Sequence, residues 1–198
     1  EGKSYYKAMA AAVNFAFSNR HIIMCDVIRA FEDVLKKSAE SMGFKLVYDV
    51  AHNIAKWERH VGRDLLVHRK GATRALPAGH SQNPARYMRT GHPALVPGSM
   101  GTGSYVVVGK DELAESFFSV NHGAGRRLSR TRARSITKQD FERAMGDVVY
   151  NAASYKDIVD EAPLAYKDVE EVVDVLVKRN ITIPVARLVP LAVVKGVD

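Results

Sequence analysis

The sequence is poor in the features that build disulfide-linked or membrane-spanning proteins. It contains a single cysteine, Cys25, among 198 residues, so it cannot form an internal disulfide framework. Cys25 falls within a helical pattern, and we interpret it as a buried structural thiol. The chain has no run of about 18 apolar residues, which a membrane-spanning helix needs, and it does not open with a signal peptide. We therefore expect a cytoplasmic protein with no membrane partner.

The sequence also lacks the histidine spacings that indicate a metal site and the composition that indicates a disordered chain. Its seven histidines are dispersed, and neither an HxH nor an HExxH spacing occurs. Hydrophobic residues make up 46% of the chain and charged residues 26%, which excludes disorder and allows a core. The length fits one domain or a large piece of a bigger one. The chain begins at Glu1 rather than at Met and enters a helical pattern at once, so we expect it to be a fragment.

The net charge of +7 is distributed unevenly. Residues 121–143 contain seven basic and two acidic side chains, and residues 53–92 contain eight basic and two acidic ones. Residues 157–178 reverse the balance, with seven acids against two lysines. Two basic segments separated from an acidic one indicate a directed positive face, which favours phosphates or nucleic acid. A solvated surface with scattered counterions would give the same counts.

The hydrophobic pattern predicts an α+β protein, with helices first and a mostly antiparallel sheet after them. Apolar residues at helical spacing predict two N-terminal amphipathic helices, over residues 4–17 and 24–35, with a break near residues 19–21. Three β-rich runs follow, and Gly62 predicts a tight turn between the last two. These runs cover residues 44–50, 54–60 and 64–68.

The second half of the chain opens with a long segment rich in glycine and proline. Residues 71–104 hold six glycines and four prolines, and we interpret them as an ordered active-site loop. A buried strand should follow at residues 105–108, and Asp168 with Glu171 resembles a capping box at the start of a helix. Further helices are expected from residues 123–125 through the arginines and at 138–145. An edge or bent strand, interrupted by two prolines, is expected at 183–194.

The strongest candidate site is the segment NHGAGRR, residues 121–127. Two glycines around one small residue let successive backbone N–H groups converge on an anion, and a following helix would add its positive end. Arg126 and Arg127 can hold phosphate oxygens in a bidentate manner. His122 can serve as a proton donor, a metal ligand or a covalent nucleophile. We interpret this segment as a phosphate site, and the alternative is a tight structural turn.

Two further segments contain polar groups without a decisive pattern. In PGSMGTGSY, residues 97–105, three glycines accompany the hydroxyls of Ser99, Thr102 and Ser104, as in loops that approach a ligand closely. No Lys-Ser/Thr pair follows, so this is not a Walker A loop, and a plain glycine-rich turn is equally compatible. In DVAHN, His52 could point toward a site if the segment is a strand. One histidine does not make a metal site, so spacing favours a packed or exposed side chain.

Six blocks of the sequence, taken together, resemble one known family. YDVAHN, VHRKGATRA, GHPALVPGSMGTGSYV, NHGAGRRLSR, EAPLAYKDV and AVVKG occur in the order and at the spacing of the RtcB family of RNA ligases. The resemblance runs from residue 1 to residue 196. Members of this family act in tRNA splicing and RNA repair, where they join RNA 3′-phosphate or 2′,3′-cyclic phosphate ends to 5′-hydroxyl ends.

The resemblance implies a role for particular residues of this chain. His122 matches the nucleophile that attacks GTP and forms a covalent histidine–GMP intermediate, and His52 matches a ligand of the catalytic metal. Arg126 and Arg130 match arginines that hold RNA phosphates. The residues that match contacts to the guanosine nucleotide are Ser99, Ser104, Gly123, Ala124, Gly125, Tyr166 and Lys195.

The resemblance also implies cofactors and partners. GTP would be the cosubstrate, manganese the metal (two ions in the intact enzyme), RNA ends the substrate, and an archease-type activating protein a further partner. The family's remaining manganese ligands and a glutamate that reads guanine lie in N-terminal blocks that this sequence does not contain. We therefore expect residues 1–198 to be the C-terminal portion of such a ligase and to be incomplete for ligation. The alternative is a catalytically silent nucleotide- or RNA-binding module derived from the family.

Overall fold

The computed structural model describes residues 1–195, and the chain divides after Lys70 into two compact units. Helices and mainly antiparallel strands alternate along the chain, which confirms the predicted α+β class. Within the described residues, no helix combines the length and the apolar character needed to cross a membrane. Gly196, the last residue of the AVVKG block, lies outside the described residues.

The first unit begins with one continuous helix, α1 (Gly2–Leu35). The predicted pair of helices is therefore wrong, because residues 19–21 contain neither glycine nor proline and the backbone hydrogen bonds continue through them. The helix ends at Lys36, whose left-handed conformation lets its N–H donate to the carbonyl of Glu32 at 2.9 Å. Cys25 is half-exposed on α1, with its Sγ 3.8 Å from Nε2 of His21, so the interpretation as a buried thiol is also wrong.

A β-hairpin completes the first unit. β1 (Asn53–His60) pairs with β2 (Arg63–Lys70) in antiparallel register, and Gly62 has a φ of +75° in the turn, as the sequence predicted. The strand expected at residues 44–50 does not form, and this segment packs on α1 instead. The Phe44 ring lies edge-on to Phe31 at 5.3 Å, and Asp49 accepts a hydrogen bond from Nε of Arg20 at 2.8 Å.

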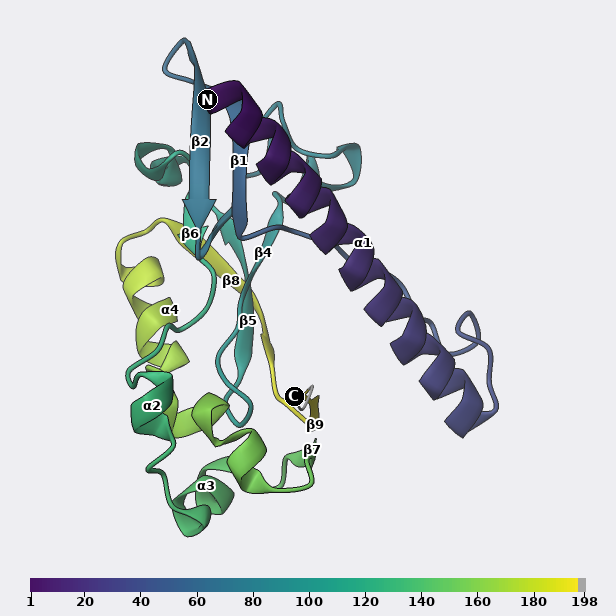
Figure 1. Ribbon diagram of the computed structural model, residues 1–198. Coiled ribbons are helices and arrows are strands. Elements are labelled where there is room, and N and C mark those ends of the chain that lie inside the picture. The colour runs from purple at the N-terminus through teal and green to yellow at the C-terminus, as the bar shows by residue number, and fades with distance from the viewer. Residues whose placement is uncertain (196–198) are drawn as a thin grey trace. The chain divides into compact units, whose positions relative to one another are not determined.

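The second unit is organised around a three-stranded antiparallel sheet with the order β4-β5-β8 (Figure 1). β5 lies in the centre, as expected for the buried strand predicted at 105–108. β8 is an edge strand that contains Pro184 and pairs with β5 through a register shift, as expected for the first part of the run at 183–194. The run is not one strand, because β8 ends at Leu188, before Pro190, and residues 192–194 form a strand in another sheet. The bounds are β4 (Pro93–Val96), β5 (Ser104–Gly109) and β8 (Thr182–Leu188). A separate pair joins β3 (Ala72–Arg74) to β6 (Ser119–Asn121).

The glycine- and proline-rich segment is ordered, but it is not a single loop. β3 and β4 lie within residues 71–104, together with a 3₁₀ turn at Ala85–Tyr87. The short connection between β4 and β5, which holds Ser99 and Thr102, has no helix or strand. Other 3₁₀ segments are Asp111–Ser116, Tyr155–Asp157, Val159–Glu161 and Pro163–Ala165.

Helices follow the HGAGR block, but the first begins later than predicted. α2 (Arg130–Ala133) starts after Ser129, because Gly123 and Gly125 adopt positive φ values that an α-helix cannot contain. α3 (Lys138–Met145) has the predicted bounds. α4 (Val169–Lys178) is capped by Asp168, whose carboxylate accepts from the N–H of Glu170. A capping box would require the bond to come from the N–H of Glu171, so the predicted capping box does not form. β7 (Val149–Asn151) and β9 (Ala192–Val194) form a short parallel pair.

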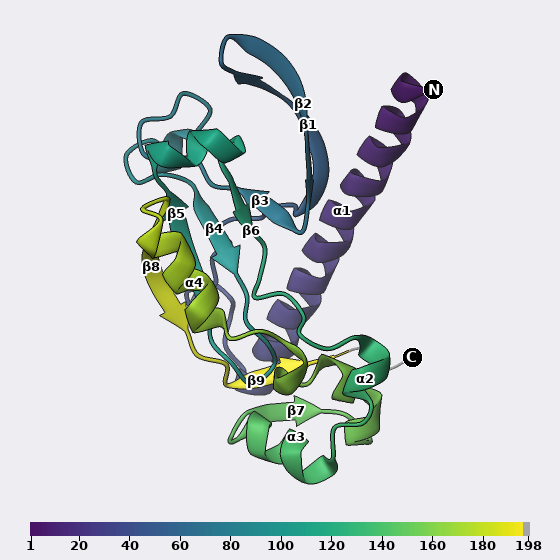
Figure 2. The same cartoon turned by 90° about the vertical axis from the view of Figure 1, so that its left-hand side faces the viewer.

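Two hydrophobic clusters hold the second unit together. One lies between the sheet and α4, which covers one face of it in Figure 2. The other joins Met100, Phe141, Met145, Ile158, Val159 and Ala162, and Val193 packs against it. This second cluster brings together the β4–β5 connection, α3, the 3₁₀ segments and β9. It therefore supports the region where the candidate site lies.

Candidate functional site

A cavity of about 240 Å³ lies in the second unit, above the second hydrophobic cluster. Three residues that the resemblance assigns to guanosine binding line it together: Ser99, Tyr166 and Lys195. They come from the β4–β5 connection, from the end of a 3₁₀ segment and from the residue after β9. The other residues that line it are Pro97, Gly98, Met100, Glu161 and Val193. The fold thus gathers residues that are far apart in the sequence.

The β4–β5 connection is held in place by its own hydroxyl groups and by one buried anchor. The side chain of Met100 is buried in the second cluster, which fixes the neighbouring Ser99 at the cavity. The hydroxyl of Thr102 accepts from the N–H of Ser99 at 2.8 Å and lies 2.8 Å from the Oγ of Ser99. Ser104 does not line the cavity, and its hydroxyl accepts from the N–H of Gly98 at 3.3 Å. Ser104 therefore shapes the loop that presents Ser99.

The segment before Tyr166 is tied to the HGAGR block through backbone hydrogen bonds. The carbonyl of Ala165 accepts from the N–H groups of Arg127 and Leu128, at 2.8 and 3.1 Å. The N–H of Lys167 donates to the carbonyl of Gly125 at 2.9 Å. These bonds continue an antiparallel bridge between Arg126 and Tyr166. Two sequence blocks 40 residues apart are therefore joined as one piece of backbone.

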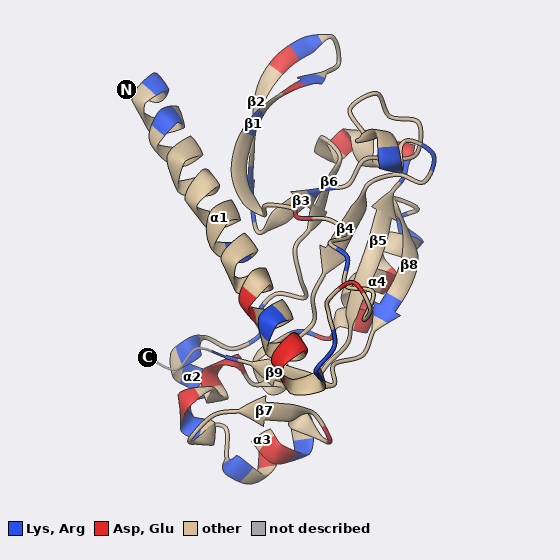
Figure 3. Ribbon diagram, turned by 90° about the vertical axis from the view of Figure 1, so that its right-hand side faces the viewer, with Lys and Arg blue, Asp and Glu red and all other residues tan. Residues whose placement is uncertain are grey.

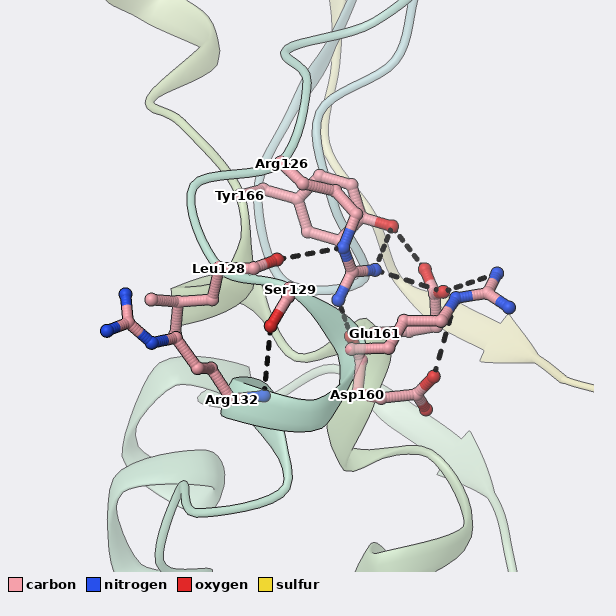
Figure 4. Close-up of polar contacts among 8 residues, drawn as sticks. Arg126, Leu128, Ser129, Arg132, Asp160, Glu161 and Tyr166 are labelled. Carbon is pink, nitrogen blue, oxygen red and sulfur yellow. Dashed lines mark hydrogen bonds and ion pairs between the residues drawn. The ribbon is translucent and has the colours of Figure 1, made fainter.

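The side chains of this joined segment form a dense polar network, shown in Figure 4. The guanidinium of Arg126 donates to Glu161 at 3.2 Å, to the phenol oxygen of Tyr166 at 3.3 Å and to the carbonyl of Leu128 at 3.1 Å. It also donates to the carbonyl of Asp160. The phenol of Tyr166 donates to the second oxygen of Glu161, and the guanidinium lies 5.1 Å from the centre of the Tyr166 ring.

This environment raises the pKa of the Tyr166 phenol above its ordinary value. Burial is the main cause, because it disfavours the charged phenolate. The hydrogen bond to Glu161 and the negative charge of that carboxylate act in the same direction, while Arg126 acts against them. Tyr166 is therefore a neutral hydrogen-bond donor near neutral pH, with its ring at the cavity wall.

Two N–H groups of the HGAGR backbone form hydrogen bonds within the protein. The N–H of His122 donates to the carbonyl of Gly71 at 2.9 Å, and the N–H of Ala124 donates to the carbonyl of Pro97 at 3.0 Å. Two of the N–H groups expected to converge on a phosphate therefore already bond to the protein. Gly123 and Gly125 do adopt positive φ values, which explains the glycines in this turn. His122 is half-buried and does not line the cavity, but Pro97, which bonds Ala124, does.

The described residues do not form a complete manganese site. Within residues 1–195, no group of three or more histidine, cysteine, aspartate or glutamate side chains is placed to hold a metal ion. His52 lies in a bend before β1, and the preceding residues are not a strand. It belongs to the first unit, whereas the cavity belongs to the second. A metal needs three or four protein ligands, so His52 alone does not form a metal site.

The basic and acidic segments are not set apart in the fold. Arg126 pairs with Glu161, and Arg130 lies 3.8 Å from a carboxylate oxygen of Asp160 and 3.5 Å from one of Glu161. Basic and acidic stretches of ribbon accordingly meet around α2 in Figure 3. The inference of a positive face separate from the acidic segment is wrong at this place, because the tertiary structure brings Asp160 and Glu161 against Arg126 and Arg130.

Sequence reasoning missed Glu161 as a site residue. It lines the cavity and contacts both Arg126 and Tyr166, but it was counted simply as one of seven acids in a negatively charged segment. Its position five residues before Tyr166, in EAPLAY, was the available signal. A carboxylate followed by proline and an aromatic residue does not by itself predict a binding site, so only the fold identifies the partners of Glu161.

Comparison with known proteins agrees with the resemblance found in the sequence. The family model described as tRNA-splicing ligase RtcB matches residues 1–196. The chain is 48% identical to the tRNA-splicing ligase RtcB of Thermococcus kodakarensis and 45% identical to that of Nanoarchaeum equitans, over 99% of its length. It covers 42% and 43% of those proteins, respectively. Against the tRNA-splicing ligase RtcB of Methanocaldococcus jannaschii it is 45% identical and covers 21%. The chain thus spans less than half the length of these relatives.

Proposed function

The chain belongs to the RtcB family, and on that premise we propose that the protein containing it is a GTP- and manganese-dependent RNA ligase. It would join RNA 3′-phosphate or 2′,3′-cyclic phosphate ends to 5′-hydroxyl ends, in tRNA splicing or RNA repair. The relatives are named tRNA-splicing ligases, which supports the reaction class. We further propose a cytoplasmic location and an archease-type activating partner.

One observation carries the proposal for this chain. Ser99, Tyr166 and Lys195 were assigned to the guanosine nucleotide from the sequence, and they line the same cavity. A volume of about 240 Å³ is small for a whole nucleotide, but it suits a purine ring with an open side for its ribose and phosphate. The ring of Tyr166 offers a stacking surface, and Ser99 and Lys195 offer polar groups.

The proposed chemistry uses His122 as the nucleophile. A ring nitrogen attacks the α-phosphate of GTP, so a nitrogen–phosphorus bond forms and pyrophosphate leaves. The GMP group then passes to the RNA 3′-phosphate and frees the histidine. Attack of the RNA 5′-hydroxyl on this activated end forms the new phosphodiester and releases GMP. Gly123, Ala124 and Gly125 follow His122 in a turn held to the cavity loop by the bond from Ala124 to Pro97.

Guanylylation of the intact protein that contains the chain tests the proposal. We expect radioactivity from [α-³²P]GTP to remain on the intact protein after denaturation when manganese is present, whereas robust labelling of the 198-residue chain alone would show that the chain is more complete than proposed. The label should be lost in His122→Ala and kept in His21→Ala, a matched histidine exposed on α1. Tyr166→Ala and Lys195→Ala should weaken labelling at low GTP concentration, since both residues line the cavity. An equal signal from [α-³²P]ATP would contradict a guanosine site.

A ligation assay addresses whether the chain is complete for catalysis. Of the manganese ligands that the resemblance implies, this chain contains His52, so we propose that it does not complete ligation without the rest of the protein. Ligation of a 3′-phosphorylated RNA to a 5′-hydroxyl RNA by the 198-residue chain would overturn this. If neither the chain nor the intact protein is labelled but GMP still binds, the protein is a catalytically silent nucleotide- or RNA-binding module.

A further inference from the structure

The two arginines that resemble RNA phosphate ligands differ sharply in their surroundings. The side chain of Arg126 is 27% exposed, and its guanidinium donates to four oxygen atoms, on Leu128, Asp160, Glu161 and Tyr166. A guanidinium has five N–H donors in a fixed plane, so Arg126 has little capacity left for a phosphate. A phosphate would have to displace bonds that also hold the backbone and the Tyr166 phenol.

Arg130 is in the opposite situation. Its side chain is 74% exposed, and its contacts with Asp160 and Glu161 are 3.8 and 3.5 Å long. Exposed ion pairs of such length contribute little to stability, because water screens them and the side chain loses entropy. Arg130 can therefore exchange its carboxylate partners for a phosphate at small cost, without disturbing the cavity.

We propose that Arg126 and Glu161 are positioning residues that hold the Tyr166 ring at the cavity wall, and that Arg130 is the arginine that binds an RNA phosphate. Glu161 accepts the phenol hydrogen with one oxygen and a guanidinium hydrogen with the other. The phenol oxygen in turn accepts from Arg126, so the three side chains form a closed ring of hydrogen bonds. Ring orientation thus depends on the hydroxyl as well as on packing. The inference rests on the proposed guanosine role of the cavity.

GMP binding tests the positioning role. Tyr166→Phe keeps the ring but removes the hydroxyl, and we expect it to weaken GMP binding to the chain about fivefold by calorimetry, the effect of one net hydrogen bond. Glu161→Gln and Arg126→Lys should weaken binding to a similar degree, and Tyr166→Ala by about tenfold or more, since stacking is also lost. Arg132→Gln is the control, because Arg132 points away from Glu161 in Figure 4. GMP affinity equal to wild type in Tyr166→Phe and Glu161→Gln would overturn the positioning role.

A tyrosine titration reads the same network without any nucleotide. The ultraviolet absorbance of Tyr166 ionisation is isolated as the difference from Tyr166→Phe. Because Glu161 raises the pKa of this phenol, Glu161→Gln should shift its titration to lower pH. An unchanged titration would show that Glu161 does not hold the phenol in solution. If the wild type binds no GMP, the proposed function fails, while this titration still decides whether the network exists.

Salt dependence of RNA binding separates the two arginines. With a 3′-phosphorylated single-stranded RNA, each lost phosphate contact lowers the slope of log affinity against log salt concentration by about 0.7. We expect this decrease in Arg130→Gln and an unchanged slope in Arg126→Gln. Arg126→Lys should also leave the slope unchanged while GMP binding weakens. A decrease in Arg126→Gln equal to that in Arg130→Gln, or none in Arg130→Gln, would overturn the assignment.

Discussion

Replacing Gly98 with alanine should open the loop that presents Ser99. A Cβ on Gly98 would lie 2.1 Å from the carbonyl oxygen of Gly103 and 2.6 Å from Oγ1 of Thr102, whereas real Cβ atoms stay at least 3.0 Å away. The two sides of the loop must therefore separate by about 0.9 Å. A movement of this size would break the hydrogen bond from the Ser99 N–H to Thr102, which is now 2.8 Å long.

The cost of this opening follows from the contacts that it breaks. One or two hydrogen bonds contribute about 1 kcal/mol each, and forced displacement in a packed region costs about 1–3 kcal/mol. Together we expect a loss of about 2–5 kcal/mol, which lowers the Tm by about 4–20 °C for a chain of this size. GMP binding should weaken by about fivefold to thirtyfold, because Ser99 moves out of place at the cavity.

Calorimetric unfolding and GMP titration of the variant measure both effects. Gly79→Ala is the control: Gly79 has a φ of +78°, but a Cβ there meets nothing within 4 Å. That variant should lose about 1–2 kcal/mol from backbone strain and keep its GMP affinity. If Gly98→Ala loses no more stability than Gly79→Ala and binds GMP like the wild type, the loop is not held as described.

Three further changes test the packing and electrostatics of the second unit. Phe141 is fully buried in the second cluster, so Phe141→Ala should cost about 3–5 kcal/mol in denaturant unfolding, and a loss below about 1 kcal/mol would contradict that packing. Thr73 is fully buried, and its Oγ1 has no hydrogen-bond partner within the described residues. Thr73→Val should therefore raise the free energy of unfolding by about 1 kcal/mol, whereas a free energy of unfolding below that of the wild type would indicate a hydrogen-bond partner of Thr73. The hydrogen bond from Tyr105, followed by that from Arg187, lowers the pKa of the Glu170 carboxyl below its ordinary value of 4.5. The ionised carboxylate therefore stabilises the fold above pH 4.5, and this contribution is lost as the pH falls through the lowered pKa. Glu170→Gln should flatten this acid-side decline in Tm, and an unchanged decline would exclude Glu170 as its source.

Local patterns predicted the elements whose formation depends on nearby residues. The helix at 138–145 and the hairpin around Gly62 were predicted with nearly correct bounds, because helical periodicity and a turn glycine act within a few residues. The break in α1 was predicted wrongly, since a weak interruption in the pattern does not overcome continuous backbone hydrogen bonding. The strand at 44–50 was also predicted wrongly: its β propensity is real, but Phe44 packs against Phe31 of the helix, and Leu46 and Val47 are exposed.

The candidate site divides in the same way. Ser99, Tyr166 and Lys195 could be named because they lie in blocks that resemble a known family, and their roles stay a prediction. Glycine spacing predicts a phosphate site at residues 121–127, and this stays a prediction. The structure bonds two of its N–H groups, those of His122 and Ala124, to other segments of the chain. Spacing shows where a backbone can turn, but it does not show which acceptors will reach its N–H groups.

The sequence by itself determined the α+β class, the family and the uneven charge, because composition, periodicity and block order are properties of the chain. The tertiary structure decided how those charges meet. The acids of 157–178 lie apart from the arginines of 121–143 in the sequence, yet Glu161 contacts both Arg126 and Arg130. Coulomb attraction and desolvation depend on distance and burial, and sequence separation specifies neither. For that reason the fold, and not the count of charges, distinguishes an arginine that positions a tyrosine from one that is available to a phosphate.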